Sequence, residues 1–346
     1  MGKTAVICGY YGRGNLGDEA ILSVLLQMLP QDWQRVVISG DPRATKNLHG
    51  DGIQVCNSYD FWGIFSAMRR ADYFIWGGGS LMQDATSRRS PFYYGSLMRL
   101  AQGLGLKTIA WAQGIGPLQY ESSAWWAKNC LQNCSAVSVR DRKSAELLKE
   151  WGISALFAPD PVWILPAELP RGVGDLPKPR IAVCLKSHPL LDLPKLSQIA
   201  EALVLLQMAT DAFILLIPFQ IQQDQAVAEY LARKIPFCCV WQDNRPQSVK
   251  GLLSTVEMAI AMRLHGVIMA LGAGVPCFAI SYDPKVRAVM DELGLVGYDL
   301  EQMPDDHHQL HEDWLQFYVD GKPLSPEAIA TLCRDVLQHQ ELFQRC

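Results

Sequence analysis

The sequence predicts an α/β protein built from two Rossmann-like domains, each with a doubly wound parallel sheet. The first observation is length, because 346 residues exceed what one ordinary hydrophobic core needs and suit two domains. The second is alternation: short apolar runs and longer amphipathic segments follow one another through both halves, as in βαβ units. The third is a proline- and glycine-rich stretch at 171–179, a composition typical of a linker.

These observations give the expected domain boundaries. We expect an N-terminal domain over 1–170, a linker over 171–179 and a C-terminal domain over 180–324. In the N-terminal domain the predicted strands are short apolar runs, each followed by helical sequence. They lie at 5–10, 36–39, 73–76, 108–111 and 136–139.

The second half repeats this pattern, with predicted strands at 180–185, 213–217, 238–241, 258–262 and 277–280. Near the end of the chain, Ser325 and Pro326 are the residue types preferred at the N-cap and first position of a helix. Ile329, Leu332 and Val336 then form an apolar stripe. We therefore expect the segment 325–346 to be a C-terminal helix that packs back on the first domain.

Composition and charge narrow the classes of function. Hydrophobic residues make up 49% of the chain and charged residues 19%, which is typical of a globular protein without disordered tails. The formal net charge is −4 and no block of like charges occurs, so a nucleic-acid partner is not expected. Small or sugar-like ligands are favoured.

The cysteines and the apolar segments indicate a cytoplasmic protein. Ten cysteines are scattered without a CxxC pair, so we expect buried thiols in a reducing compartment. The apolar run at the N-terminus is too short for a signal peptide, and the apolar stretch 266–282 is broken by glycines and a proline. Aromatic residues at 61–65 and 125–126 could touch the inner face of the membrane, although such faces more often pack on a sheet.

A glycine-rich loop follows the first predicted strand. Residues 12–17 match the dinucleotide-binding pattern GxGxxG, and Asp41 follows the next strand where a ribose-binding acid would lie. However, Asp18 and Glu19 place two carboxylates at the helix start, where they would repel a pyrophosphate. These acids could simply complement the helix dipole. Alternatively, Asn15 and Asp18 bind sugar hydroxyls.

A second glycine-rich turn follows the strand at 73–76, and a third loop follows the strand at 108–111. Glycines at the carboxyl end of a parallel strand let a ligand approach the backbone, although a purely structural turn explains them equally well. Neutral and acidic side chains nearby suit hydroxyl groups. The candidate sugar-binding residues are Gly78, Gly79, Gln83, Asp84, Tyr94 and Gln113.

Cationic side chains occur where several predicted strands end. Arg140 ends one strand, Arg263 and His265 begin the helix after another, and Lys285 occupies a matching position two residues after a candidate cap. The first turn of a helix offers unpaired N–H groups to an anion. Arg140 could instead pair with a carboxylate, and His265 could be a capping or core histidine. Lys186, in the loop after 180–185, is a further candidate.

Three histidines near the C-terminus have spacing compatible with a metal site. His307 and His311 lie four residues apart, with His308 beside them. They belong to a polar insertion, for which a solvated segment is the simpler explanation. We therefore predict no metal.

With these motifs in view, the chain resembles the polysaccharide pyruvyl transferase family. The resemblance rests on five blocks in order, at 9–21, 77–84, 113–117, 139–144 and 263–266. It implies a fold similar to two-domain GT-B glycosyltransferases, with the active site between the domains. It also implies transfer of a pyruvyl group from phosphoenolpyruvate to a sugar, which forms a cyclic ketal and releases phosphate. Phosphoenolpyruvate is a co-substrate, and no cofactor is expected.

The resemblance also suggests roles for residues. Arg140, His265 and Lys285 would be donor-binding and catalytic residues, with phosphoenolpyruvate on the second domain. The first domain would hold the acceptor, a free or lipid-linked intermediate of a cell-wall polysaccharide. Lys186 stands where an arginine is expected. His265 would protonate either the enol methylene carbon or the departing phosphate.

Two other functions remain open at this stage. A GT-B glycosyltransferase that uses a nucleotide sugar is the main alternative, since a fold does not fix a function. A non-catalytic polysaccharide-binding protein is the other. No sequence feature marks a subunit interface, so the oligomeric state is left open.

Overall fold

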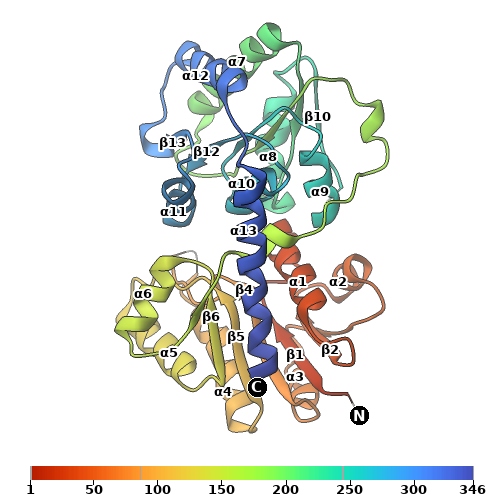
Figure 1. Ribbon diagram of the computed structural model, residues 1–346, viewed down its shortest axis with the longest axis vertical. Helices are drawn as coiled ribbons and strands as arrows, with labels where there is room; N and C mark the ends of the chain where they lie inside the picture. Colours follow the sequence, from red (N-terminus) through yellow and green to blue (C-terminus); the bar gives the residue numbers. More distant parts are fainter. Residues whose placement is uncertain (1, 86, 244, 346) are drawn as a thin grey trace. The chain divides into compact units, whose positions relative to one another are not determined.

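The computed structural model describes residues 2–85, 87–243 and 245–345. The chain divides into two compact units (Figure 1). Unit 1 comprises Met1–Ile164 and Thr331–Cys346, and unit 2 comprises Leu165–Ala330. Each unit contains one parallel sheet with helices between consecutive strands, so the predicted fold class of two parallel-sheet α/β domains is confirmed.

Unit 1 has a seven-stranded sheet in the order β3-β2-β1-β4-β5-β6-β7. The strands are β1 (Thr4–Cys8), β2 (Gln34–Ser39), β3 (Gln54–Asn57), β4 (Tyr73–Gly79), β5 (Lys107–Gln113), β6 (Ala136–Val139) and β7 (Leu156–Phe157). The helices between them are α1 (Leu16–Met28), α2 (Pro42–His49), α3 (Phe61–Met68), α4 (Ser90–Gly103), α5 (Glu121–Gln132) and α6 (Arg142–Glu150). The direction of winding reverses between β1 and β4, which is where ligands usually bind in open parallel sheets.

Unit 2 has a six-stranded sheet in the order β10-β9-β8-β11-β12-β13. The strands are β8 (Arg180–Cys184), β9 (Phe213–Leu216), β10 (Cys238–Val240), β11 (Met258–Ala261), β12 (Cys277–Ser281) and β13 (Gly297–Asp299). The helices are α7 (Leu193–Thr210), α8 (Ile221–Ala232), α9 (Pro246–Leu253), α10 (Leu264–Gly272), α11 (Pro284–Leu293) and α12 (His307–Asp320). The next helix, α13 (Pro326–Val336), begins in unit 2, and its residues from Thr331 belong to unit 1. Here the winding reverses between β8 and β11.

The strands at the centre of each sheet are buried on both faces. All seven residues of β4 and all five of β8 are buried, as expected for parallel strands covered by helices on both sides. Three strands at the sheet edges, β3, β7 and β13, are absent from the sequence-based prediction. Their residues are half-buried or exposed, so they lack the continuous apolar run that marks the central strands.

The segment 171–179, which we expected to join the domains, lies inside unit 2. It contains a short 3-10 helix, Val173–Asp175, whose C-terminal end is held by Arg180. The buried guanidinium of Arg180 donates hydrogen bonds to the carbonyls of Val173 (2.8 Å), Leu176 (2.6 Å) and Pro177 (2.9 Å). The boundary between unit 1 and unit 2 lies before this segment, between Ile164 and Leu165.

The C-terminal segment, blue in Figure 1, is fixed to the unit 1 sheet by a buried histidine. His339 lies in a 3-10 helix, Leu337–Glu341, and is fully buried. Its Nε2 lies 3.0 Å from the carbonyl oxygen of Pro159, and its Nδ1 lies 2.8 Å from Ser138 Oγ. Because a carbonyl only accepts, Nε2 carries the proton and Nδ1 accepts the Ser138 hydroxyl.

This hydrogen-bond chain continues into the sheet. Ser138 Oγ accepts the backbone N–H of Ala112 (2.8 Å), a non-glycine residue with a φ of +47° at the irregular end of β5. A positive φ is unfavourable for alanine and persists where surrounding contacts hold it. Burial lowers the pKa of His339 to about 4, so the ring stays neutral at neutral pH.

Replacement of His339 with Phe tests this network. The change removes both hydrogen bonds and leaves Ser138 and the Pro159 carbonyl without their partner. We expect the free energy of unfolding to fall by about 2–4 kcal/mol at pH 7.5. Chemical denaturation of wild type and variant measures it, with replacement of the exposed His308 by Phe as the control.

The same pair of proteins gives a pH test. A histidine with a folded pKa of about 4 and an unfolded pKa near 6.5 contributes stability that is present above pH 6.5 and is lost as the pH falls toward 4. Between pH 7.5 and 5 the wild type should therefore lose about 2 kcal/mol more than the His339→Phe variant. Equal losses in the two proteins would show that His339 is not buried in its neutral form.

Candidate functional site

Four cationic or titratable side chains follow three neighbouring strands of unit 2. Lys186 follows β8, Arg263 and His265 follow β11, and Lys285 follows β12, and these strands are adjacent in the sheet. The carboxyl ends of parallel strands lie along one edge, next to the point where the winding reverses. The structure therefore brings these four sequence-predicted residues to the same edge of one sheet.

Arg263 is held by a buried carboxylate. It is the N-cap residue of α10, and its Nε and Nη2 donate to Asp224 Oδ2 (3.0 Å) and Oδ1 (2.6 Å). The side chain of Asp224 is fully buried and also accepts the backbone N–H groups of Gln220 (2.9 Å) and Ser187 (3.3 Å). We expected Arg263 to bind substrate, but its charge is balanced by Asp224. The pair fixes the corner between β11 and α10, and a contact of Arg263 with substrate stays a prediction.

Lys186 lies partly buried over an aromatic ring. Its Nζ is 4.2 Å from the ring centroid of Tyr282, which follows β12. Burial lowers the pKa of Lys186, and the positive charge of Arg263 lowers it further, against the opposing effect of Asp283 and Asp224. Burial also raises the pKa of Tyr282 to about 12. An anion bound here would relieve the repulsion between the two cations.

His265 and Lys285 occupy equivalent positions in two helices. Each is the second residue of its helix, α10 or α11, and each is partly buried. Asp283 caps α11 by accepting the backbone N–H of Lys285 (2.8 Å). The two side chains thus project from first turns, where backbone N–H groups and the helix dipole favour negative ligands.

In unit 1, Arg140 is also paired with a buried carboxylate. Its Nη1 lies 2.5 Å from Asp160 Oδ2, and Nη2 donates to Ser80 Oγ (3.2 Å). Both charged side chains are more than 90% buried, and Asp160 Oδ1 accepts the N–H of Val162 (2.9 Å). Gly114 lies so close that a Cβ there would be 3.3 Å from Arg140 Nε. This arrangement matches the alternative that Arg140 is an ion-pair partner, with a buried rather than a surface acid.

The backbone of the glycine-rich loop after β1 is bound by a carboxylate from the helix that follows it, α1. Glu19 is buried, and its Oε1 accepts the backbone N–H of Gly12 (2.7 Å) while Oε2 contacts His49 Nε2 (2.9 Å). Asn15 is the N-cap of α1, with its side-chain oxygen accepting the N–H of Gly17 (3.0 Å). A pyrophosphate would need the N–H groups that these residues already use, which argues against a dinucleotide site.

Asp18, Gly79 and Tyr94 lie together at the carboxyl end of the unit 1 sheet. Gly78 and Gly79 have φ values of +87° and +88°, and a Cβ on Gly79 would lie 3.0 Å from Asp18 Oδ1. Burial raises the pKa of Tyr94, with smaller contributions from Cys8 and from the charge of Asp18. Asp18 thus lies against the buried end of β4 at Gly79, and its charge acts on the phenol of Tyr94.

Two predicted sugar-binding residues have structural roles instead. Asp84 is buried, and its two oxygens accept the backbone N–H groups of Gln119 (2.7 Å) and Tyr120 (3.1 Å). Gln113 is buried, and its Nε2 donates to the carbonyls of Trp111 (3.0 Å) and Trp76 (3.4 Å). Both side chains therefore hold backbone segments, and Gln113 Oε1 is a buried acceptor without a hydrogen-bond partner among the described residues. Gln83 is only partly buried.

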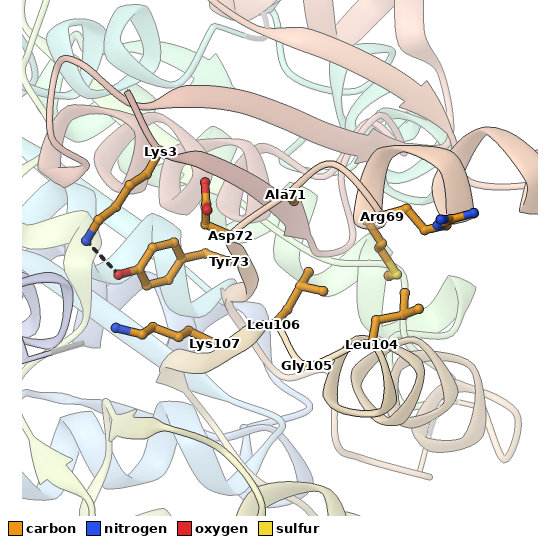
Figure 2. A pocket seen from close by; sticks show the side chains of 10 residues that line it. Lys3, Arg69, Ala71, Asp72, Tyr73, Leu104, Gly105, Leu106 and Lys107 are labelled. Atoms are coloured by element: carbon orange, nitrogen blue, oxygen red, sulfur yellow. Dashed lines mark hydrogen bonds between the residues drawn. The ribbon is translucent and has the colours of Figure 1, made fainter. Parts of the chain in front are cut away.

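Two pockets that are open to solvent lie away from these residues. A cavity of about 460 Å³ at the amino end of the unit 1 sheet contains Lys3, whose Nζ donates to Tyr73 OH (2.9 Å), with Lys107 on the other side of the ring (Figure 2). A cavity of about 750 Å³ in unit 2 lies beside Phe278, Tyr298 and the end of α12. Neither contains a predicted site residue. The strand positions and charges, rather than cavity size, therefore define the candidate site.

No group of three His, Cys, Asp or Glu side chains in the described part of the chain is placed to hold a metal ion. The nine cysteines of that part are free thiols, and Cys346 lies outside it. No helix within the described ranges has both the length and the apolar character that a bilayer span requires.

The fold resembles that of nucleotide-sugar enzymes with very different sequences. UDP-N-acetylglucosamine 2-epimerase from Neisseria meningitidis, bound to UDP-GlcNAc, is 9% identical with a TM-score of 0.65, over 99% of this chain and 98% of that one. A putative epimerase of the same kind from Listeria monocytogenes is 10% identical with a TM-score of 0.64, over 99% and 94%. The spinosyn rhamnosyltransferase SpnG, complexed with thymidine diphosphate, is 10% identical with a TM-score of 0.60, over 99% of both chains. The protein therefore has a GT-B-like fold.

The similar structures show the fold but not the family, which comparison of sequences can indicate. No curated protein is detectably similar to the chain in sequence. The family model for polysaccharide pyruvyl transferases, in contrast, matches residues 15–284, which include Asp18, Arg140, Arg263 and His265. The match covers well over half of the chain, so the protein belongs to the polysaccharide pyruvyl transferase family.

Proposed function

We propose that the protein transfers the pyruvyl group of phosphoenolpyruvate to two hydroxyls of a sugar, which forms a cyclic ketal and releases phosphate. The observation that carries the proposal is the cationic edge of unit 2, where Lys186, His265 and Lys285 follow three adjacent strands. Phosphoenolpyruvate carries a carboxylate and a phosphate, so it needs several cationic partners. Lys186 Nζ is held over the ring of Tyr282, where the charge of Arg263 repels it, and a bound anion would relieve that repulsion.

In this proposal unit 2 binds the donor. Lys186 and Lys285 interact with the phosphate and carboxylate, and the first-turn N–H groups of α10 add hydrogen bonds. Arg263 stays bound to Asp224 and holds the corner rigid. No metal or cofactor is required for the reaction as proposed, because the protein cations balance the charge of the substrate.

His265 acts as the general acid. Its imidazolium form delivers a proton to the C3 methylene of phosphoenolpyruvate, which leaves a cation-like C2. A sugar hydroxyl attacks C2 and returns its proton to His265. The C2–O bond to phosphate then breaks, a second hydroxyl attacks C2, and its proton leaves with the phosphate. Protonation of the phosphate by His265 is the alternative assignment.

Unit 1 binds the acceptor in this proposal. Asp18 and Tyr94 supply hydrogen-bonding groups for sugar hydroxyls, and Gly78 and Gly79, both buried and with positive φ, form the end of β4 beside Asp18. Arg140 is assigned a positioning role, because a substrate carboxylate could reach its guanidinium only by displacing Asp160. The acceptor is a polysaccharide precursor, free or lipid-linked, processed in the cytoplasm or at the inner face of the membrane.

Replacement of His265 with Gln tests the acid. We expect affinity for phosphoenolpyruvate to stay within a few-fold, because the other cations remain, while phosphate release falls by at least about 100-fold. Calorimetry measures the affinity for phosphoenolpyruvate, and a phosphate assay with a panel of sugar acceptors measures phosphate release. His308→Gln, an exposed histidine of the same unit, is the control.

The same assay separates the competing functions. Unchanged phosphate release in His265→Gln would remove His265 from the chemistry. Release of a nucleotide from a nucleotide sugar, without phosphate release from phosphoenolpyruvate, would favour the glycosyltransferase. A protein that binds polysaccharide and releases neither product would be a non-catalytic binding protein.

Replacement of Lys186 with Gln tests the anion site. The dissociation constant for phosphoenolpyruvate should rise about 10-fold, the effect of one charge-assisted contact of about 1.5 kcal/mol. In the wild type, affinity for phosphoenolpyruvate should also decrease as the pH rises through the depressed pKa of Lys186, and Lys186→Gln should lose this dependence.

Lys234→Gln is a matched control, because Lys234 also lies over a tyrosine ring in unit 2. Equal effects of the two substitutions would contradict the assignment.

A further inference from the structure

Arg13 differs from the other arginines at the carboxyl ends of the strands because no acid balances its charge. Arg140 is paired with Asp160 and Arg263 with Asp224. Among the described residues, no carboxylate oxygen lies within ion-pair distance of the Arg13 guanidinium, and the partners of Arg13 are all neutral. The guanidinium of Arg13 therefore carries a positive charge that no ion pair with a described residue balances.

Neutral contacts hold Arg13 in one orientation. Its Nη1 donates to Tyr59 OH (3.0 Å) and its Nη2 is 3.4 Å from Ser58 Oγ. The guanidinium carbon lies 5.9 Å from the ring centroid of Tyr10 and 5.3 Å from that of Tyr59. A Cβ on Gly40 would be 2.8 Å from Arg13 Nε, so the glycine leaves room for this arrangement. The side chain is thus oriented before any ligand arrives.

The guanidinium has donors left for a ligand. Arginine carries five N–H groups, and the two neutral hydroxyls use two of them. The side chain is only partly buried, so the remaining groups can reach a bound molecule. A planar fork with adjacent N–H groups suits an oxyanion better than a neutral hydroxyl.

Arg13 also lies next to the proposed sugar site. Arg13 contacts Ser58, which also contacts Tyr93, and the rings of Tyr93 and Tyr94 pack edge to face with their centroids 5.1 Å apart. Tyr93 OH donates to the carbonyl of Ser58 (3.1 Å), which links the Arg13 contacts to α4. A ligand held by Asp18 and Tyr94 would therefore have Arg13 within its reach.

We propose that Arg13 binds an oxyanion, of the phosphate class, that the acceptor sugar carries. The exposed rings of Tyr10 and Tyr59 would flank the sugar beside it. This inference rests on the proposed function and narrows it, since it makes the acceptor a sugar phosphate or diphosphate rather than a neutral glycan. The phosphate belongs either to a soluble sugar phosphate or to a lipid-linked one, and both present the same group to Arg13.

Residue-specific labelling tests the proposal without any turnover. Phenylglyoxal modifies accessible arginines, and peptide mass spectrometry gives the rate at each one. Pyrophosphate and a panel of hexose 1-phosphates, at constant ionic strength, should slow modification of Arg13 at least 3-fold relative to Arg43, an exposed arginine of the same unit. The matching neutral methyl hexosides should not.

Three results would overturn the proposal. One is equal protection of Arg13 and Arg43, and another is protection by neutral hexosides as strong as by the phosphates. The third is protection by vesicles of phosphatidylglycerol but by none of the soluble phosphates, which would make Arg13 a membrane contact.

Kinetics give the second measurement. Once an acceptor is turned over, Arg13→Gln should raise its KM about 10- to 100-fold, the effect of losing a charge-assisted contact, with kcat and the KM for phosphoenolpyruvate nearly unchanged. Arg13→Lys should recover part of the loss. An unchanged acceptor KM would refute the role of Arg13. If phosphoenolpyruvate is not used at all, the labelling result still stands, because it depends only on unit 1.

Discussion

The bidentate ion pair between Arg263 and Asp224 holds together the corner on which the candidate site depends. Asp224 is fully buried, and it accepts backbone N–H groups from the loop after β8 and from the start of α8, in addition to both contacts from Arg263. Removal of one partner from a buried pair typically costs about 3–5 kcal/mol, because the other charge is left in a low-dielectric interior. The pair thus fixes three segments at the edge of the sheet where Lys186, His265 and Lys285 lie.

Unit 1 uses the same arrangement at its own sheet. Arg140 and Asp160 form a buried pair that connects the end of β6 with the segment before the first 3-10 helix, and Ser80 joins it from the loop after β4. His339 reaches the carbonyl of the neighbouring Pro159 from the C-terminal segment. In both units a balanced arginine stabilises the loops. The ligand-binding charges we propose, Lys186 and Arg13, have aromatic rings as partners instead.

The sequence predicted the fold well because its central strands are buried on both faces. Such strands are continuous apolar runs, and all ten predicted runs overlap strands of the two sheets. Edge strands such as β3 and β13 are half-exposed and carry no comparable pattern. The motifs were also sufficient to place Arg140, Arg263, His265 and Lys285 after strands, because a glycine or cap residue marks each corner.

The partners of these residues could not be predicted in the same way. Asp224 is 39 residues from Arg263, and His339 is 201 residues from Ser138, so each pairing depends on how the whole unit folds. The partners of Asp84 and Gln113 could not be predicted from local sequence either. Their residue types suit sugar hydroxyls, yet both are buried, and the carboxylate of Asp84 and the amide nitrogen of Gln113 are bonded to backbone groups. Local sequence gives the type of a polar side chain, whereas its neighbours decide whether it binds a ligand or holds a loop.

A crystal structure of the protein with phosphoenolpyruvate tests the central claim most directly. The account predicts phosphate and carboxylate oxygens within hydrogen-bond distance of Lys186, Lys285 and the first-turn N–H groups of α10, with His265 beside the C3 methylene and Arg263 still bound to Asp224. Phosphoenolpyruvate bound to Arg140 with Asp160 displaced, or bound away from the carboxyl edge of the unit 2 sheet, would contradict it.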